Sequence, residues 1–345
     1  MSKSEIHIEN IETAASRKQD HIELALKSQI GTNELDKRFS YEPLFAAHPS
    51  EKLAPFSFLG KIIQTPIWVS SMTGGTEKAN KINKNLALVC QKFGMGMGLG
   101  SCRSILDGNE RLPDFDLRNI IGDDLPFYAN LGIAQLENIL ENNAYDKIDN
   151  LVHKLKADGL IIHVNPFQEW LQPEGDILKN PPIETIQKLL EITDLSIIVK
   201  EVGQGFGKES LRALIQLPID AIEFAAAGGT NFSKLELLRQ NNNLPNYFDD
   251  LTRIGHSAKE MVENTNLLLT ELGESALCNQ FIISGGVRNF LDGYFLTKKL
   301  YSNAVFGMAS GLLSYADKSY EALEQFVEAQ IEGLKLANAY LTINE

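Results

Sequence analysis

Eight short apolar runs recur along the chain, and each ends in a loop rich in glycine and small polar residues. Within a run the apolar character is continuous rather than alternating, which is typical of parallel strands covered on both faces. The runs are Pro66–Ser70, Gly94–Gly98, Pro126–Ala129, Gly159–Val164, Ser196–Lys200, Ala221–Phe224, Phe281–Ser284 and Ala304–Gly307. Amphipathic segments separate them, so the sequence predicts a parallel sheet with helices between its strands.

The segments between the runs carry helix signals. Ile82 and Val89 fall on one face of a predicted helix. Another helix is predicted from about Ala258, with Ser257 as its N-cap and Gly273 at its end. Strand–helix repeats of this number predict a closed (β/α)₈ TIM barrel, with a doubly wound open sheet as the alternative.

The spacing of the runs also indicates the domain organisation. We expect one domain over residues 1–345, with an N-terminal cap or lid segment in 1–60 and the barrel in 61–345. The gap between the sixth and seventh strands is longer than the others, and it is interpreted as an insertion within the barrel. A chain of 345 residues is long for one domain, but α/β barrels reach this size.

Charge and composition restrict the partners. The net charge of −13 argues against a nucleic-acid or anionic-membrane partner, because both require basic residues to replace counterions. No run approaches the roughly 20 apolar residues of a membrane span. The three cysteines are scattered and do not form a disulfide framework. We therefore expect a cytoplasmic protein that binds a small molecule.

Glycines and isolated polar residues crowd the carboxyl ends of the predicted strands, where barrel enzymes build their active sites. Gly285 and Gly286 follow the seventh strand, and Gly307 and Gly311 surround the end of the eighth. This pairing matches the phosphate site of many barrels, and Arg288 could pair with the phosphate. Two tight turns and a surface arginine are the alternative. A phosphate in this position is commonly part of flavin mononucleotide (FMN).

Other loop residues suit the flavin ring. Lys200 ends an apolar strand, so its ammonium group should face the barrel mouth; a lysine that extends to solvent is the alternative. The residues expected along the ring are Ser71, Met72, Thr73, Ser101, Asn130, Lys200 and Thr230.

The loop after the fourth strand is the most polar of the eight. It contains His163, Asn165, Gln168, Glu169, Gln172, Glu174 and Asp176. One acid beside a substrate diphosphate would suit Mg²⁺, which is often bound by few carboxylates together with phosphate oxygens. A solvated polar loop is the alternative, and zinc is disfavoured because His163 lacks partners at ligand spacing.

The segments RKxxH, SMTGG, HxNxxQE followed by QPEGD, VKEVG, GGTNF and SGGxR occur in this order between Arg17 and Arg288. Together they resemble the type 2 isopentenyl-diphosphate isomerases, and the likeness extends over nearly the whole chain. The resemblance implies a TIM barrel that interconverts isopentenyl and dimethylallyl diphosphate. It also implies reduced FMN and Mg²⁺ as cofactors, NADPH as the reductant and a homotetramer.

The resemblance assigns roles to individual residues. The implied substrate contacts are Arg17, Lys18, Ser101, Arg103, His163, Asn165 and Gln168. The implied FMN contacts are Ser71, Met72, Thr73, Ser101, Asn130, Lys200, Thr230, Gly285, Gly286, Arg288, Ala309 and Ser310. Gln168 and Glu236 are the implied catalytic residues, and Glu169 is the implied Mg²⁺ ligand. The chain departs from the family pattern at Cys102, at Ala225–Ala226 and in the insertion after the sixth strand.

Moving a double bond requires a proton to be added at one end and removed at the other. The residues matched to the substrate offer no convincing pair of acids and bases, so we expect the reduced flavin to exchange the protons. Two alternatives remain. One is an FMN-dependent oxidoreductase of the hydroxy-acid oxidase or inosine-monophosphate dehydrogenase kind, using His163 or Cys102. The other is a flavoprotein without catalytic activity.

Overall fold

The computed structural model describes residues 14–49, 52–71, 73–240 and 247–344. These form two compact units, one made of the residues up to Tyr41 and those from Thr342, the other of Glu42–Leu341. Within the smaller unit lie helix α1 (Ala14–Leu24), the 3₁₀ turn Thr32–Glu34 and strand β1 (Phe39–Tyr41). Strand β1 pairs with β12 (Leu341–Ile343), and Asn344 donates a backbone hydrogen bond to Arg38 O at 2.8 Å.

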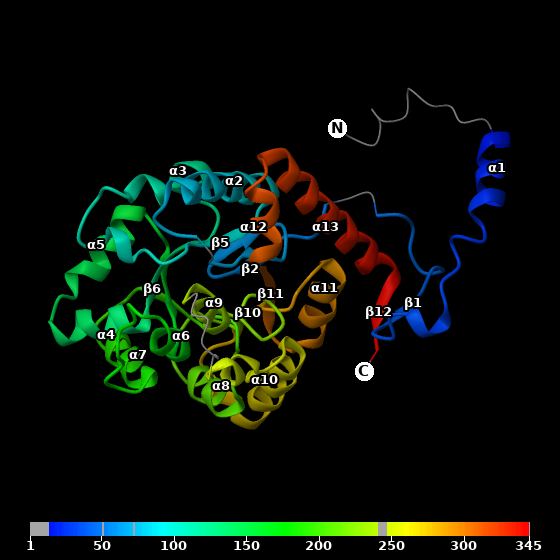
Figure 1. The fold of residues 1–345 in the computed structure, drawn as a ribbon. Helices are drawn as coiled ribbons and strands as arrows, with labels where there is room; N and C mark the ends of the chain where they lie inside the picture. Colours follow the sequence, from blue (N-terminus) through cyan, green and yellow to red (C-terminus); the bar gives the residue numbers. More distant parts are fainter. Residues whose placement is uncertain (1–13, 50–51, 72, 241–246, 345) are drawn as a thin grey trace. The chain divides into compact units, whose positions relative to one another are not determined.

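The larger unit is a closed barrel of eight parallel strands (Figure 1). Its strands are β4 (Ile67–Val69), β5 (Gly96–Gly98), β6 (Phe127–Gly132), β7 (Gly159–His163), β8 (Ser196–Lys200), β9 (Ala221–Glu223), β10 (Gln280–Ser284) and β11 (Asn303–Met308). They pair in the order β4 to β9, then β10 and β11, and β11 pairs with β4. The predicted TIM barrel is therefore confirmed, and the open doubly wound sheet is excluded.

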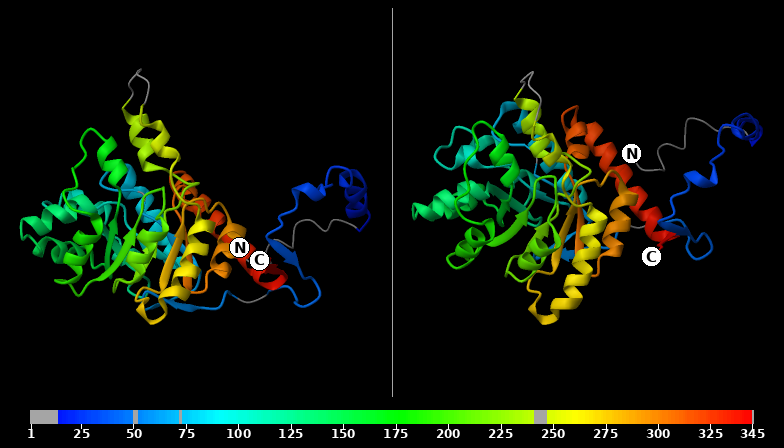
Figure 2. Two further views of the ribbon diagram at one scale, coloured as in Figure 1. Left: turned by 90° about the horizontal axis from the view of Figure 1, so that it is seen from below. Right: turned by 60° about the horizontal axis from the view of Figure 1, so that its bottom comes forward.

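Helices surround most of the barrel, as the two views in Figure 2 show, whereas α6 (Pro166–Leu171) and α9 (Phe232–Arg239) lie at its mouth. The other helices of the larger unit are α2 (Glu77–Phe93), α3 (Arg118–Ile121), α4 (Ile133–Glu141), α5 (Asp146–Leu155), α7 (Pro182–Leu190), α8 (Lys208–Ile215), α10 (Ala258–Leu272), α11 (Phe290–Lys299), α12 (Ser310–Ala316) and α13 (Tyr320–Tyr340). The predicted insertion contains α9, a 3₁₀ turn at Asp249–Arg253 and α10.

The helix signals read from the sequence are realised in α2 and α10. In α2 the side chains of Ile82 and Val89 are buried, as their shared face predicts. In α10 the Ser257 hydroxyl accepts a hydrogen bond from the backbone N–H of Glu260 at 3.2 Å. The helix ends at Gly273, whose φ of 52° is costly for residues with a side chain.

The barrel interior explains why the second predicted strand is rich in glycine. The Trp68 ring packs edge-to-face on Phe58 and Tyr128, with centroids 6.3 and 6.1 Å away. A Cβ atom at Gly96 would lie 2.3 Å from the Trp68 ring. The indole therefore occupies the space that a side chain on β5 would need, and both Gly96 and Gly98 are buried.

An antiparallel hairpin of β2 (Phe56–Phe58) and β3 (Lys61–Ile63) covers the amino end of the barrel. Its Lys61 ammonium bonds Asp158 just before β7, with Nζ–Oδ1 2.6 Å. On the opposite wall, the Leu59 N–H bonds Gln280 Oε1 at the start of β10, at 2.8 Å. The segment predicted as one cap, 1–60, is thus divided between the smaller unit and this hairpin.

Candidate active site

Two adjoining cavities occupy the carboxyl end of the barrel. The first, of about 260 Å³, lies among the loops after β9, β10 and β11, and we call it the glycine cavity. The second, of about 650 Å³, lies among the loops after β4, β5, β6 and β7, and we call it the polar cavity. Both are lined by Ser71, Lys200, Val202 and Phe232. The two cavities therefore adjoin at the mouth of the barrel and form a single site with two compartments.

The glycine cavity is built from backbone that approaches backbone closely. Gly285 and Gly286 have φ values of 87° and 73°, which residues with a side chain rarely adopt. A Cβ atom at Gly285 would lie 2.0 Å from the Ala226 carbonyl oxygen. The predicted contacts that line this cavity are Ser71, Lys200, Thr230, Gly285, Gly286, Arg288, Ala309 and Ser310.

The Arg288 side chain lies at the rim of the glycine cavity. It is 79% exposed, and its Nε is 3.1 Å from Asp292 Oδ2. The Asp292 carboxylate, which is almost fully buried, holds the guanidinium group at the edge of the cavity. The guanidinium group can therefore bind an anion at the rim without a change in backbone conformation.

Three buried polar atoms that line the glycine cavity have no hydrogen-bond partner among the described residues. They are Ser70 Oγ, Ser71 Oγ and Glu223 Oε2. Buried polar groups are normally satisfied, so these atoms indicate a bound molecule or water. Sequence reasoning missed Ser70 and Glu223, although an acid inside the apolar run of residues 221–224 was a visible signal.

Lys200 faces the barrel mouth, as its place at the end of β8 predicts. The side chain is 5% exposed, and Nζ donates a hydrogen bond to the Glu201 carbonyl at 2.7 Å. Its in-register neighbours are His163 on β7 and Glu223 on β9. The Lys200 charge therefore acts on the nearby His163 imidazole, and the side chain lines both cavities.

His163 lines the polar cavity and is held by an amide. Its Nδ1 is 2.8 Å from Asn130 Oδ1, while Asn130 Nδ2 donates to the Leu99 carbonyl at 2.9 Å. Because Asn130 presents its oxygen, Nδ1 carries the proton, and Nε2 is left as an acceptor. Burial, reinforced by the nearby Lys200 charge, lowers the pKa of His163 to about 3. The imidazole is therefore neutral at physiological pH.

Gln168 also lines the polar cavity, and its amide is oriented from both sides. Asn165 Nδ2 donates to Gln168 Oε1 at 3.1 Å, and Gln168 Nε2 donates to Glu236 Oε1 at 3.2 Å. Glu236 is buried and also pairs with Arg239. The two residues predicted to be catalytic are thus joined through α6 and α9.

The predicted metal ligand, Glu169, is buried on α6. Its Oε1 accepts from Asn165 Nδ2 at 3.1 Å, and its Oε2 accepts from Gln172 Nε2 and from the Asp176 N–H, both at 2.9 Å. The protein thus supplies three of the roughly four hydrogen bonds that a carboxylate accepts. Among the described residues, no group of three or more His, Cys, Asp and Glu side chains could hold a metal ion.

The remaining predicted residues lie in several places. Ser101 and Arg103 line the polar cavity, and Arg103 Nη1 is 3.2 Å from Asp176 Oδ2. Thr73 hydrogen-bonds Asn83. Arg17 and Lys18 are exposed on α1, in the smaller unit. Met72 lies outside the described residues.

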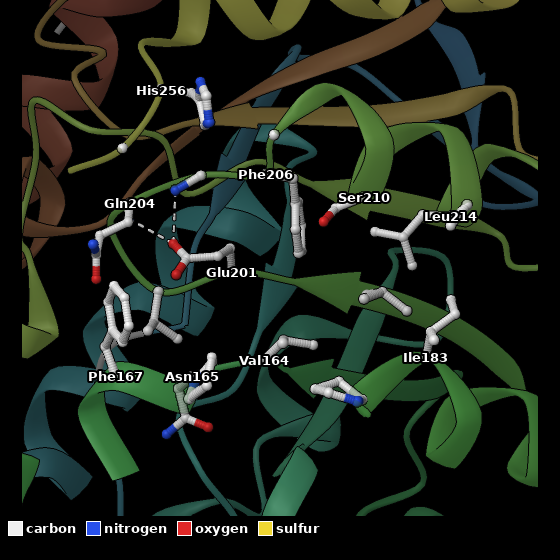
Figure 3. A pocket seen from close by; sticks show the side chains of 18 of the residues that line it. Val164, Asn165, Phe167, Ile183, Glu201, Gln204, Phe206, Ser210, Leu214 and His256 are labelled. Carbon is white, nitrogen blue, oxygen red and sulfur yellow. Dashed lines mark hydrogen bonds between the residues drawn. The ribbon is translucent and has the colours of Figure 1, made fainter. Parts of the chain in front are cut away.

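A third pocket, of about 560 Å³, lies beside the mouth and was not predicted (Figure 3). Its walls include the apolar side chains of Val164, Ile183, Phe206 and Leu214, together with the Glu201 carboxylate. Glu201 Oε2 accepts hydrogen bonds from the N–H groups of residues 203, 204 and 205 at 2.7, 2.6 and 2.8 Å. This pocket shares Gln168 and Val202 with the polar cavity.

Comparison with curated proteins gives the family. Isopentenyl-diphosphate delta-isomerase of Rickettsia akari is 35% identical over 326 residues, which cover 93% of this chain and 92% of the relative. The Rickettsia typhi protein of the same name is 33% identical over 325 residues, with 93% and 91% covered. The chain belongs to the isopentenyl-diphosphate delta-isomerase family. Membership of this isomerase family confirms the resemblance drawn from the motifs, although no family model matches the chain.

Solved structures share the fold at low sequence identity. The flavin-binding domain of baker's yeast flavocytochrome b2 is 12% identical with a TM-score of 0.61, and the match covers 88% of the isomerase chain and 71% of that chain. A mandelate oxidase variant with a monooxide FMN adduct is 12% identical with a TM-score of 0.56, and 89% and 88% are covered. These likenesses support the barrel fold. Among the described helices, none has the length and apolar character of a transmembrane span.

Proposed function

We propose that this chain interconverts isopentenyl and dimethylallyl diphosphate, using reduced FMN in the barrel mouth and Mg²⁺ on the substrate diphosphate. The observation that carries the proposal is the Gln168–Glu236 hydrogen bond in the wall of the polar cavity. It places a fixed amide, backed by a buried carboxylate, beside a cavity that adjoins the glycine cavity. Family membership supplies the reaction.

The residues of the mouth fit FMN. The glycine loops leave backbone exposed to a phosphate, Arg288 stands at their rim, and orphaned polar atoms line the wall. We propose that Gly285, Gly286, Arg288, Ala309 and Ser310 hold the phosphate. Ser71, Met72, Thr73, Ser101, Asn130, Lys200 and Thr230 would hold the rest of the cofactor. Bound reduced FMN supplies ring nitrogens that donate and accept protons without net electron transfer.

The protein's own groups position the substrate. The Gln168 amide does not titrate near neutrality, so its role is to orient the reacting carbons, with Asn165 and Glu236 fixing its rotamer. Glu236 is a buried acid one hydrogen bond behind Gln168, where it would hold or pass on a proton through Gln168 or water. His163, with its lowered pKa, is neutral and offers Nε2 as an acceptor.

Mg²⁺ would be held mainly by the substrate. Glu169 has about one acceptor position left beyond its three protein hydrogen bonds, so it would be a single carboxylate ligand beside phosphate oxygens. Arg17, Lys18, Ser101 and Arg103 would bind the diphosphate. NADPH as reductant and a homotetramer are also proposed, and their support is the family resemblance alone.

The oxidoreductase alternatives fit the side chains less well. An imidazole with a pKa of about 3 is a weak base, which disfavours His163 in hydroxy-acid oxidation. Burial raises the pKa of the Cys102 thiol to about 12, so it would not be a thiolate nucleophile. Instead, Cys102 donates its backbone N–H to the Asn130 carbonyl at 2.8 Å.

The test is turnover of isopentenyl diphosphate by the FMN-loaded protein. We expect dimethylallyl diphosphate with reduced FMN and almost none with oxidised FMN, and the reductant should not be consumed in proportion to product. Replacing FMN by 5-deazaFMN should abolish turnover while preserving binding. A protein that binds no FMN, or that consumes reductant with each turnover, would contradict the proposal.

A further inference from the structure

The pocket beside the mouth differs in charge from the two cavities of the mouth. Among the described residues that line it there is no lysine or arginine, whereas two acids, Glu201 and Glu209, are present. The backbone N–H groups of residues 203, 204 and 205 already bond the Glu201 carboxylate. Phosphate groups need cations or free N–H groups, and the proposed cofactor and substrate both carry phosphate. This pocket therefore suits neither of the ligands proposed for the mouth.

Most of the pocket wall is apolar. The side chains of Val164, Phe206 and Leu214 are 9%, 7% and 4% exposed. Figure 3 shows Ile183 and Leu214 on the side of the pocket away from the Glu201 carboxylate. The volume of about 560 Å³ lies within the range of small-molecule sites. The apolar side of the pocket can therefore hold the hydrocarbon part of a ligand.

The Glu201 carboxylate forms the polar end of the pocket and is 8% exposed. Its Oε2 accepts the three backbone hydrogen bonds, whereas its Oε1 accepts none from the described residues. Lys200 Nζ bonds the backbone carbonyl of Glu201 at 2.7 Å rather than its carboxylate. Burial raises the pKa of Glu201, and neither the backbone N–H groups nor the Lys200 charge cancels the rise. The carboxylate charge is thus incompletely compensated, so a further cation beside Oε1 would stabilise it.

We infer that this pocket binds an apolar molecule that carries a protonated amine. The hydrocarbon part packs between α7 and α8, which supply Ile183 and Leu214, and the ammonium group donates a hydrogen bond to Glu201 Oε1. A chain with a carboxylate or phosphate in place of the amine is excluded, because its charge would lie against Glu201 in a wall without cations.

The pocket has two connections to the candidate catalytic groups. Gln168 lines both the pocket and the polar cavity, and its neighbour on α6, Phe167, also lines the pocket. On the opposite side, Ser233 Oγ of α9 donates to Gln204 Oε1 at 2.8 Å, and α9 also carries Glu236. A ligand in the pocket should therefore shift the Gln168 amide and slow turnover without displacing the diphosphate. This regulatory part of the inference rests on the proposed function.

The binding test is calorimetry on the full-length chain, supplied with FMN, with three probes that share one hydrocarbon chain: octylamine, 1-octanol and octanoate. Octylamine should bind at one site, 1-octanol roughly tenfold or more weakly because it lacks the charge, and octanoate not measurably. Glu201→Gln should reduce the affinity for octylamine to that for 1-octanol and leave 1-octanol unchanged. Ala213→Phe fills the pocket from α8 and should abolish binding of both. Ala329→Phe, at an exposed position on α13, is the matched control and should change neither affinity.

Steady-state kinetics test the link to the mouth. Octylamine should lower the kcat of the wild type about fivefold or more, leave the KM for isopentenyl diphosphate unchanged, and have no effect on Ala213→Phe. Octanoate that binds as tightly as octylamine, or octylamine that fails to bind the wild type or binds both variants unchanged, would overturn the inference. Binding without any change in kcat would overturn its regulatory part. A wild type that is inactive without octylamine would instead refute the proposed function, and calorimetry would still measure the pocket.

Discussion

Gln168 and Glu236 are joined by a hydrogen bond of 3.2 Å that links α6 to α9 at the wall of the polar cavity. Glu236→Gln keeps the size of the side chain but removes its charge and its ability to hold a proton. We expect kcat to fall by about a hundredfold, the lower range for general acid–base groups. The KM for isopentenyl diphosphate and the affinity for FMN should change little. Steady-state kinetics with reduced FMN measure kcat and KM of the variant. An unchanged kcat would show that Glu236 has only a structural role, as the partner of Arg239.

Glu169 is predicted to act through Mg²⁺. Glu169→Gln should raise the Mg²⁺ concentration needed for half-maximal activity by about tenfold or more, because a neutral amide is a poor ligand for a hard cation. The flavin spectrum should not change. Glu184→Gln, an exposed acid on α7, is the control for general charge effects. Normal activity of the Glu169 variant at low Mg²⁺ would show that this acid only organises its loop.

Arg17 and Lys18 are predicted to bind the diphosphate, which does not change during the reaction. Arg17→Ala and Lys18→Ala should therefore raise KM by about tenfold each with little effect on kcat, since they remove binding that is equal in ground and transition states. Lys27→Ala, another exposed lysine of the same unit, is the matched control. A loss confined to kcat would contradict this role.

His163 should make the free energy of unfolding depend on pH. Its folded-state pKa is lowered from 6.5 to about 3, so below pH 6.5 the unfolded chain binds a proton that the folded protein does not. Stability from this group is fully present above pH 6.5 and is lost as the pH falls toward 3, at no more than about 1.4 kcal/mol per pH unit. Because the imidazole is half-buried at a cavity wall, we expect a smaller slope.

The check is urea unfolding of wild type and His163→Gln between pH 7 and 4. The free energy of unfolding of the wild type should fall relative to that of the variant as the pH falls, since the glutamine does not titrate. A constant difference over this range would show that His163 protonates normally in the folded protein.

Local sequence signals were enough to locate the strands. The run Ser196–Lys200 coincides with β8, and Gly159–Val164 differs from β7 by one residue. Continuous apolar runs survive in a parallel barrel because both faces are covered, so each strand is recognisable without its neighbours. The cap of α10 was also predictable, since Ser257 and Gly273 act through nearby backbone groups.

Features created by distant contacts were not predictable. The hairpin β2–β3 depends on Asp158 and Gln280, which lie about a hundred and two hundred residues away in the sequence. The pocket beside the mouth forms between helices whose spacing no motif encodes. The surroundings of Glu223 could not be predicted either, because its Oε1 accepts a hydrogen bond from Ser284, about sixty residues away in the sequence, and its Oε2 has no partner among the described residues. The catalytic roles of Gln168 and Glu236 were implied by the family resemblance alone, and their hydrogen bond is seen only in the structure.

The hairpin at the amino end of the barrel contributes to stability at a place far from the groups that bind the ligands. Lys61 and Leu59 bond residues at the starts of β7 and β10, and the other ends of these strands, at His163 and Ser284, line the two cavities of the mouth. Substitutions in the hairpin should change the melting temperature while the reaction chemistry stays the same, and substitutions at the mouth should do the reverse. Thermal stability and catalytic activity can therefore be altered independently, by substitutions at opposite ends of the same strands.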